Sequence, residues 1–186
     1  GSLPDGQPFV AADSEHFDAR LEGNVLTSSG DIRNSPLRSA RRYEFLNDRV
    51  RCEVRLMRAT GDTVFDLWGG RPWWRGRVSE AWEMIPFVSP PARGRNPGPP
   101  TRLLARDAEG AEKEVGGDPM EAGEITIDRG GFGVRILLDR PRNVRRGEND
   151  TLMIQAAAAI VEAETITVAY DLLPFETDGS EKGGTP

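Results

Sequence analysis

The feature that most constrains the fold is a strict two-residue alternation in the segment 41–57. In its second half, the apolar residues Val50, Cys52, Val54 and Leu56 alternate with the charged residues Arg49, Arg51, Glu53 and Arg55. A period of two puts neighbouring side chains on opposite faces of a β-strand, so one face is apolar and the other is charged. The segment therefore predicts a half-buried antiparallel β-hairpin.

The dipeptide Asn47-Asp48 stands where this hairpin has to turn. Asn and Asp tolerate the positive φ angles that a two-residue hairpin turn requires. Such a turn makes cross-strand neighbours of Phe45 and Val50, Tyr43 and Cys52, Glu44 and Arg51, and Arg42 and Glu53. The first two pairs are apolar and the last two join opposite charges, so both faces agree on one register. The hairpin indicates a fold class and says little about function.

Similar short alternating segments follow along the chain, without a convincing amphipathic helix among them. In 16–22 we expect Phe17, Ala19 and Leu21 to face inward. Two later segments place their apolar residues on single faces: Ile125 and Ile127, then Val134, Ile136 and Leu138, with Phe132 leading in. Between them, Arg129-Gly130-Gly131 is expected to form a turn.

The window 155–164 allows two interpretations. Its four consecutive alanines favour a helix by propensity, but small side chains also suit a tightly packed inner strand. We favour the strand, because the segments on both sides alternate. The chain then has about nine to eleven strands, which predicts an all-β fold: an antiparallel two-sheet β-sandwich with long Pro- and Gly-rich loops.

The length of 186 residues suits one domain. We expect a flexible lead-in over 1–15, the β-sandwich over 16–175, and a disordered, Gly-rich and charged tail over 176–186. The stretch 89–100 contains five prolines and is expected to be an exposed loop.

Composition excludes several classes of function. The net charge of −6 argues against a general nucleic-acid binder, and no apolar run is long enough for a membrane span. Cys52 is the only cysteine, so an intrachain disulfide is impossible and a buried core thiol is expected. The chain begins Gly1-Ser2, which is typical of a tag remnant. We therefore expect a piece of a larger or processed protein, extracellular or periplasmic if a leader has been removed.

The sequence contains no recognisable catalytic or metal-binding motif. His16 is the only histidine, so a serine triad has one candidate base, and no Gly-x-Ser-x-Gly motif accompanies it. One His and one Cys cannot make a structural zinc site. A carboxylate pair such as Glu80 and Glu83 remains an alternative for glycosidase chemistry. We assign no catalytic residue, no metal ligand and no cofactor, although a calcium ion bound by backbone carbonyls stays open.

The four tryptophans are unusually concentrated, since all of them lie between Trp68 and Trp82. The predicted ligand-binding residues in this stretch are Trp73, Trp74, Arg71, Arg75 and Arg77. Indole faces stack on the C–H faces of sugar rings, and arginine binds carboxylate or sulfate bidentately. The alternatives are that the indoles fill the core or contact another domain of a parent chain.

Three segments together resemble a known family. They are Leu37-Arg-Ser-Ala-Arg-Arg-Tyr-Glu-Phe-Leu-Asn-Asp-Arg-Val-Arg-Cys-Glu-Val54, Trp82-Glu-Met-Ile-Pro-Phe87 and Gly131-Phe-Gly-Val-Arg-Ile-Leu-Leu-Asp139. In strand order and residue types, 37–175 resembles the β-sandwich domain that follows the helical toroid of heparinase II/III-like polysaccharide lyases. Those lyases draw catalytic Tyr and His largely from the toroid, and the His-Arg pair common in the sandwich is replaced here by Arg41-Arg42. The resemblance thus implies an accessory sandwich of a polysaccharide-processing protein.

Three hypotheses follow. The first is a non-catalytic β-sandwich accessory domain that contacts an oligosaccharide, a polysaccharide or a partner domain through the Trp/Arg stretch. The second is a structural or protein-interaction module of a surface or assembly protein. The third is a lyase or glycosidase, which needs a pocket that gathers His16, Tyr43 or Tyr170 with carboxylates.

Overall fold

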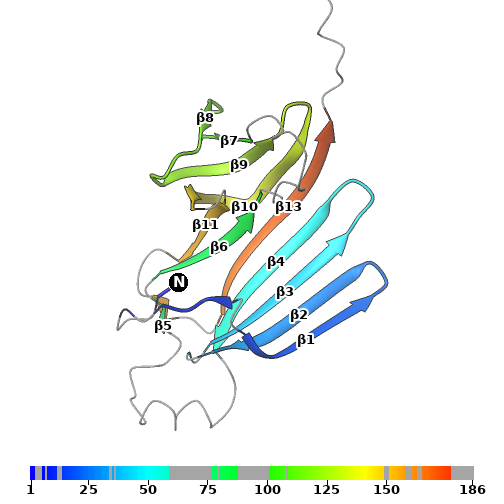
Figure 1. Ribbon diagram of the computed structural model, residues 1–186, viewed down its shortest axis with the longest axis vertical. Helices are drawn as coiled ribbons and strands as arrows, with labels where there is room; N and C mark the ends of the chain where they lie inside the picture. Colours follow the sequence, from blue (N-terminus) through cyan, green and yellow to red (C-terminus); the bar gives the residue numbers. More distant parts are fainter. Residues whose placement is uncertain are drawn as a thin grey trace, which may run out of the picture. The chain divides into compact units, whose positions relative to one another are not determined.

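The structure is a computed structural model. It describes residues 1–2, 6, 8–11, 14–33, 35, 37–58, 77–78, 80–87, 101–107, 109–148, 151–157, 161–162 and 165–176. Over these residues it is built from β-strands without an α-helix, and every ladder recorded residue by residue is antiparallel. The all-β antiparallel prediction is confirmed (Figure 1). The described parts of the window 155–164 are strands, as we favoured.

The strands are β1 (Ser14–Glu22), β2 (Val25–Ile32), β3 (Leu37–Phe45), β4 (Val50–Arg58), β5 (Arg77–Val78), β6 (Ala81–Pro86), β7 (Arg102–Arg106), β8 (Glu112–Glu114), β9 (Met120–Asp128), β10 (Phe132–Gly147), β11 (Thr151–Ala157), β12 (Val161–Glu162) and β13 (Thr165–Glu176). Eleven of them form one sheet in the order β1-β2-β3-β4-β13-β10-β9-β7-β8, with β11 paired to β10 and β6 paired to β11. The strands β12 and β5 form a separate two-stranded sheet.

The chain divides into two compact units. Unit 1 comprises Gly1–Leu46, Arg51–Glu83 and Gln155–Ala169; unit 2 comprises Asn47–Val50, Met84–Ile154 and Tyr170–Pro186. Because four of the five boundaries fall inside strands, β4, β6, β11 and β13 each contribute residues to both units.

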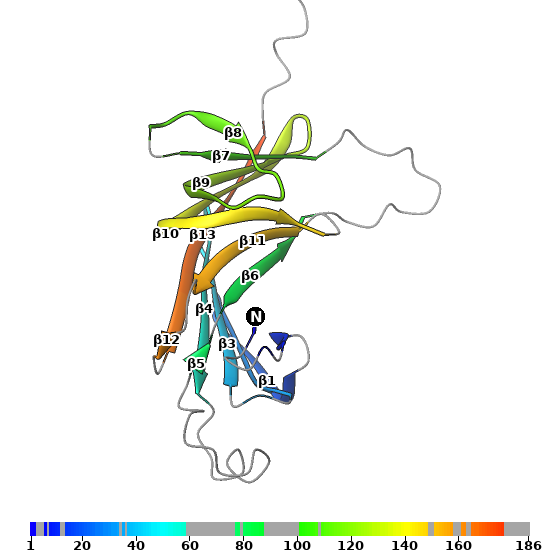
Figure 2. The ribbon, with the colours of Figure 1, turned by 90° about the vertical axis from the view of Figure 1, so that its left-hand side faces the viewer.

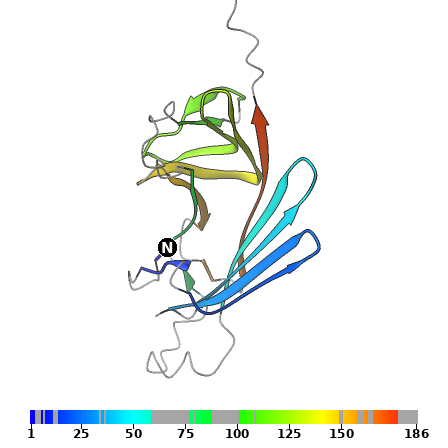
Figure 3. The same cartoon turned by 45° about the vertical axis from the view of Figure 1, so that its right-hand side comes forward.

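Unit 1 is organised around the two hairpins β1–β2 and β3–β4, drawn in blue and cyan in Figure 3. The central strand β2 pairs with β1 on one side and β3 on the other, so Leu26 lies opposite both Leu21 and Tyr43. Its buried cluster gathers Phe9, Ile32, Leu37, Ala81 and Ala157 at one end of these strands. Phe9 belongs to the expected lead-in, so this early segment contributes to the core.

The inward orientation that we expected for Phe17 and Leu21 is wrong, because these side chains are 65 and 67% exposed. Phe17 lies in a register shift between Glu15 and Asp18, where His16 has a φ of 50° and the strand departs from regular pairing. Leu21 lies next to the β1–β2 turn, at the opposite end of the strands from the buried cluster.

The positive φ angles expected in the β3–β4 turn are also absent. Among the described residues other than glycine, only His16 has a positive φ, so Asn47 and Asp48 do not. The strand β3 ends at Phe45 and β4 begins at Val50, which leaves four connecting residues. A connection of this length is commonly built on an ordinary type I turn and does not need positive φ at its centre.

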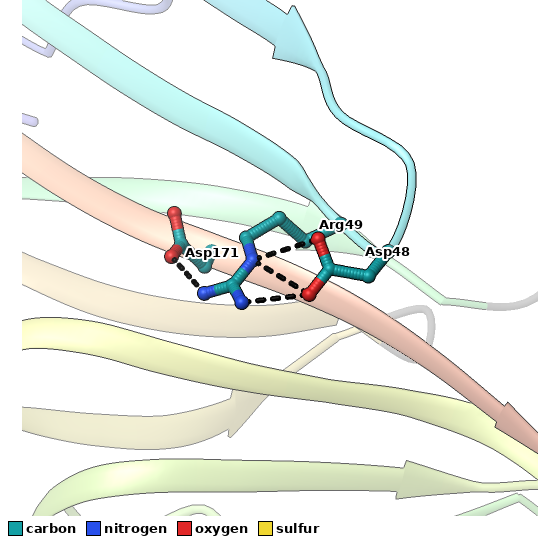
Figure 4. A network of polar contacts seen from close by, with 3 residues as sticks. All are labelled: Asp48, Arg49 and Asp171. Carbon is teal, nitrogen blue, oxygen red and sulfur yellow. Dashed lines mark hydrogen bonds and ion pairs between the residues drawn. The ribbon is translucent and has the colours of Figure 1, made fainter.

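The β3–β4 connection is anchored by a polar network in unit 2 (Figure 4). The guanidinium of Arg49 donates to Asp48 through Nη2 at 2.7 Å and to Asp171 of β13 through Nη1 at 3.3 Å. The hydrogen bond from Arg49 lowers the pKa of Asp48, and the two carboxylates raise the pKa of Arg49. A loop that was expected to turn by backbone conformation is therefore held by side chains.

Unit 2 is centred on β10, which pairs with β9 and β13 through its first half (Figure 2). Ile136 lies opposite Ile125 of β9 and Leu172 of β13, and Val134 lies opposite Ile127, so the predicted apolar face is confirmed. After a register shift between Leu137 and Arg142 in its ladder with β9, the second half of β10 pairs with β9 again and also with β11. At this shift the buried Arg142 donates to Asp139 at 3.1 and 3.2 Å.

No helix in the described part of the chain has the length and apolar character needed to cross a bilayer.

Candidate functional site

The predicted Trp/Arg site lies almost wholly outside the described residues. Trp73, Trp74, Arg71 and Arg75 belong to the stretch 59–76, of which nothing is described. The backbone of Arg77 begins β5, opposite Glu162 of β12. Trp82 lies on β6, and its indole N–H donates to the carboxylate of Glu80. The role of the Trp/Arg stretch therefore stays a prediction.

A different polar site is described on the sheet of unit 1. It is a hollow of about 240 Å³, here called the polar hollow, lined by Asp18, Thr27, Ser28, Ser29, Ala40, Arg41, Arg42, Glu53 and Arg55. Ser29 lies opposite Asp18 of β1 and Ala40 of β3. Because the side chains of Ser29 and Ala40 are short, they leave a depression in the sheet surface between the longer charged side chains at neighbouring positions.

The charged side chains around the polar hollow are held in ion pairs along their own strands. Arg42 donates to Glu44 at 2.8 Å, Arg20 to Asp18 at 3.1 Å, and Arg55 to Glu53. Residues two apart on a strand share a face, so each pair lies on one side of the sheet. A guanidinium carries five N–H donors, and one carboxylate does not use all of them. The arginines are thus oriented and can still donate to a ligand.

This arrangement offers three kinds of polar group to one small ligand. Guanidinium groups donate, the carboxylates of Asp18 and Glu53 accept, and the hydroxyls of Thr27 and Ser29 can do both. These residues were not among the predicted site residues, because a polar strand face has the same sequence pattern whether it is simply solvated or forms a site. The short residues Ser29 and Ala40 among charged neighbours were the only available signal.

A second polar cluster in unit 1 joins Arg41 to Glu83, whose side chain is only 6% exposed. Arg41 donates to both carboxylate oxygens, through Nη1 at 2.7 Å and Nη2 at 3.1 Å, and also to the hydroxyl of Tyr43 at 3.3 Å. Burial disfavours the charge on Arg41, but Glu83 and Tyr43 outweigh this effect and raise its pKa. The bidentate pairing satisfies a buried carboxylate, which is a structural role.

The pocket that the enzyme hypothesis needs is not the polar hollow, whose lining does not include His16, Tyr43 or Tyr170. His16 is exposed, with Nδ1 3.8 Å from Asp31, whereas Tyr170 is buried. Glu80 accepts a hydrogen bond from Trp82, and Glu83 accepts two from Arg41, so the two carboxylates have different partners. Within the described residues, no group of three or more His, Cys, Asp or Glu side chains is placed to hold a metal ion.

Comparisons with known proteins add little to this geometry. No family model matches the chain, and no curated protein matches it in sequence. Among solved structures, the chain is similar to a protein of Escherichia coli K12 described as a "Putative aldose 1-epimerase", with 8% identity and a TM-score of 0.47, over 87% of this chain and 69% of that one. A similarity of this size carries no inference about activity.

Proposed function

We propose that the chain is a non-catalytic binding domain that contacts an oligosaccharide through the polar hollow of unit 1. The observation that carries the proposal is that arginine, carboxylate and hydroxyl groups from the four neighbouring strands β1 to β4 surround the short residues Ser29 and Ala40. A sugar presents hydroxyls that both donate and accept, so it matches a site that offers both functions.

The arginines favour an acidic sugar. Arg42 and Arg55 approach the hollow from β3 and β4, and a guanidinium binds a carboxylate or sulfate group in a planar, charge-assisted geometry. Arg42 and Arg55 are already paired with Glu44 and Glu53, so an acidic group of the ligand would use the N–H donors that these carboxylates leave free. We therefore expect uronic-acid oligosaccharides to bind better than neutral ones.

Two sequence features support the same proposal. The Trp/Arg stretch supplies residue types that stack on sugar rings and bind acidic groups, and Trp73 and Trp74 are candidates for a second contact with the same ligand. The resemblance of 37–175 to the sandwich of heparinase II/III-like lyases suggests an accessory role in a polysaccharide-processing protein.

Calorimetric titration with a panel of neutral and uronic-acid oligosaccharides tests the proposal. We expect binding of at least one uronic-acid oligosaccharide, and a roughly tenfold loss of affinity in Arg42→Ala, since a hydrogen bond to a charged group contributes about 1.5–3 kcal/mol. Arg33→Ala is the matched control, because Arg33 pairs with Glu15 in the same unit and does not line the hollow. An absence of binding across the panel contradicts the proposal, as does an equal loss in both variants.

A second candidate function, protein interaction, rests on exposed apolar side chains in unit 1. Leu21, Phe45 and Leu46 are exposed near the turns of the two hairpins, and Phe17 is exposed at the register shift of β1. Exposed apolar groups that gather on a surface often mark a contact with another protein. Mass measurement by light scattering during size exclusion tests self-association: a stable oligomer that dissociates in Phe45→Ser supports this candidate, and a monomer at all concentrations removes it.

A further inference from the structure

Unit 2 contains a second hollow of opposite character, which the sequence analysis did not anticipate. It has a volume of about 350 Å³ and is here called the apolar hollow. Its lining consists of Ile85, Pro86, Phe87, Ile127, Arg129, Phe132, Gly133, Val134, Ile136 and Leu172. Nine of these ten residues are apolar or glycine, and Arg129 is the single charged member. This volume is within the range of pockets that take small organic molecules.

The side chains on the sheet side of the apolar hollow come from one face of three paired strands. Ile127 lies opposite Val134, and Ile136 lies opposite Leu172, so apolar groups are adjacent across β9, β10 and β13. Ile85, Pro86 and Phe87, at the end of β6, complete the lining. Ile136 is fully buried, whereas Phe132 is 53% exposed at the start of β10, so the lining runs from core to solvent.

The exposed end of the apolar hollow is held by the β9–β10 turn. The backbone N–H of Arg129 donates to the carbonyl of Phe132 at 2.9 Å, and Gly130 N–H donates to the carboxylate of Asp128 at 2.8 Å. Gly130 and Gly131 have φ angles of 74° and 116°, which only glycine adopts readily. The turn therefore fixes the backbone that carries both Arg129 and Phe132 before a ligand binds.

Across the described residues, the guanidinium of Arg129 takes part in no hydrogen bond or ion pair, whereas Arg142 is bound to Asp139 and Arg146 lies over the ring of Phe87. The exposed Arg135 of β10 has no such partner among the described residues either, but Arg129 is the arginine that lines the hollow. An unpaired guanidinium beside an apolar surface is complementary to an anion attached to an apolar body.

We propose that the apolar hollow binds a small amphipathic carboxylate, with its apolar ring or chain against Ile127, Val134 and Leu172 and its carboxylate on Arg129. The apolar body gains free energy by leaving water, and Arg129 sets the preference for an anionic end group. All lining residues belong to unit 2, so the site is separate from the polar hollow and does not depend on the glycan proposal.

The test uses three probes that separate the two parts of the ligand. They are 4-phenylbutyrate, the uncharged 4-phenylbutan-1-ol and butyrate, each titrated into the full chain and followed by amide chemical shifts. We expect 4-phenylbutyrate to bind most tightly and to shift the amides of 127–136. Arg129→Gln should weaken its binding roughly tenfold and leave the binding of the alcohol unchanged, since only the charged end group loses its partner.

Two further variants keep the test decisive. Arg135→Gln is the matched control, because Arg135 is exposed on β10, after the turn that carries Arg129, and lies outside the lining. We expect 4-phenylbutyrate and the alcohol to bind this variant as they bind the unaltered chain. Phe132→Ala alters a half-exposed side chain and should weaken both phenyl probes. The proposal is overturned if 4-phenylbutyrate does not bind, if it binds no better than the alcohol, or if Arg129→Gln and Arg135→Gln have the same effect.

Discussion

At the residue scale, the pair of Arg41 and Glu83 is the interaction whose loss has the clearest consequence. Arg41→Met leaves a nearly buried carboxylate without its bidentate partner. We expect the free energy of unfolding to fall by about 3 kcal/mol, because removing Arg41 leaves the buried charge of Glu83 without its partner. Glu83→Gln removes the charge that has to be buried and should cost less, about 1–2 kcal/mol. Urea denaturation of the two variants measures both values.

The control for this prediction is Arg42→Met, on the adjacent position of β3. Arg42 is more exposed than Arg41, and its partner Glu44 is partly exposed as well. Partly exposed ion pairs contribute little, so this variant should change stability by less than about 1 kcal/mol. Equal costs for Arg41→Met and Arg42→Met would show that the burial of Glu83 is not what makes the first pair important.

At the element scale, the β9–β10 hairpin depends on the absence of a side chain at Gly133. A Cβ there would lie 2.1 Å from the carbonyl oxygen of Ile127, which is backbone and cannot rotate away. We expect Gly133→Ala to lower the free energy of unfolding by about 1–3 kcal/mol or more through this overlap. Gly117→Ala is the matched substitution, because a Cβ at Gly117 meets nothing within 4 Å. Gly117→Ala should be neutral or should raise the free energy of unfolding by about 0.4–1 kcal/mol, because alanine reduces the conformational entropy of the unfolded chain.

The β3–β4 connection gives a prediction about pH. The pKa of Asp48 is lowered in the folded state by Arg49, so this contact stabilises the fold above the ordinary carboxyl pKa of about 3.9 and is lost as the pH falls through the lowered value. Arg49→Gln should move the Asp48 titration midpoint upward. Titration of the side-chain carboxyl carbon by NMR measures it, and an unchanged midpoint would mean that Arg49 does not hold the loop as Figure 4 shows.

These elements also show how far sequence reasoning extends. Alternation predicted that Ile125 and Ile127 share one face of their strand and that Val134 and Ile136 share one face of theirs, because side-chain direction in a strand follows from position alone. It could not predict that Phe17 and Leu21 are exposed, since exposure depends on which other elements cover a face. The two hollows were missed for the same reason. The polar hollow is lined by the consecutive strands β1 to β4, and the apolar hollow by residues from 85 to 172; in both, the pairing of the strands brings the side chains together.

At the scale of the whole molecule, the chain crosses five times between its two compact units, and four of these crossings lie inside strands. The strands β4, β6, β11 and β13 each begin in one unit and end in the other. A strand that loses its neighbours in one unit loses part of the pairing that fixes its continuation in the other. We therefore expect the two units to unfold as one cooperative transition.

Cys52 provides the probe for this prediction, because it is the only cysteine and is fully buried in unit 1. Its reaction with a thiol reagent should be negligible in the native state and should become fast at the urea concentration that unfolds the chain. Amide exchange at Ile125 and Ile136 reports on the core of unit 2. Coinciding midpoints for the thiol and the amides are expected. If Cys52 becomes reactive while these amides stay protected, unit 1 opens by itself, and shared strands do not make the two units one folding unit.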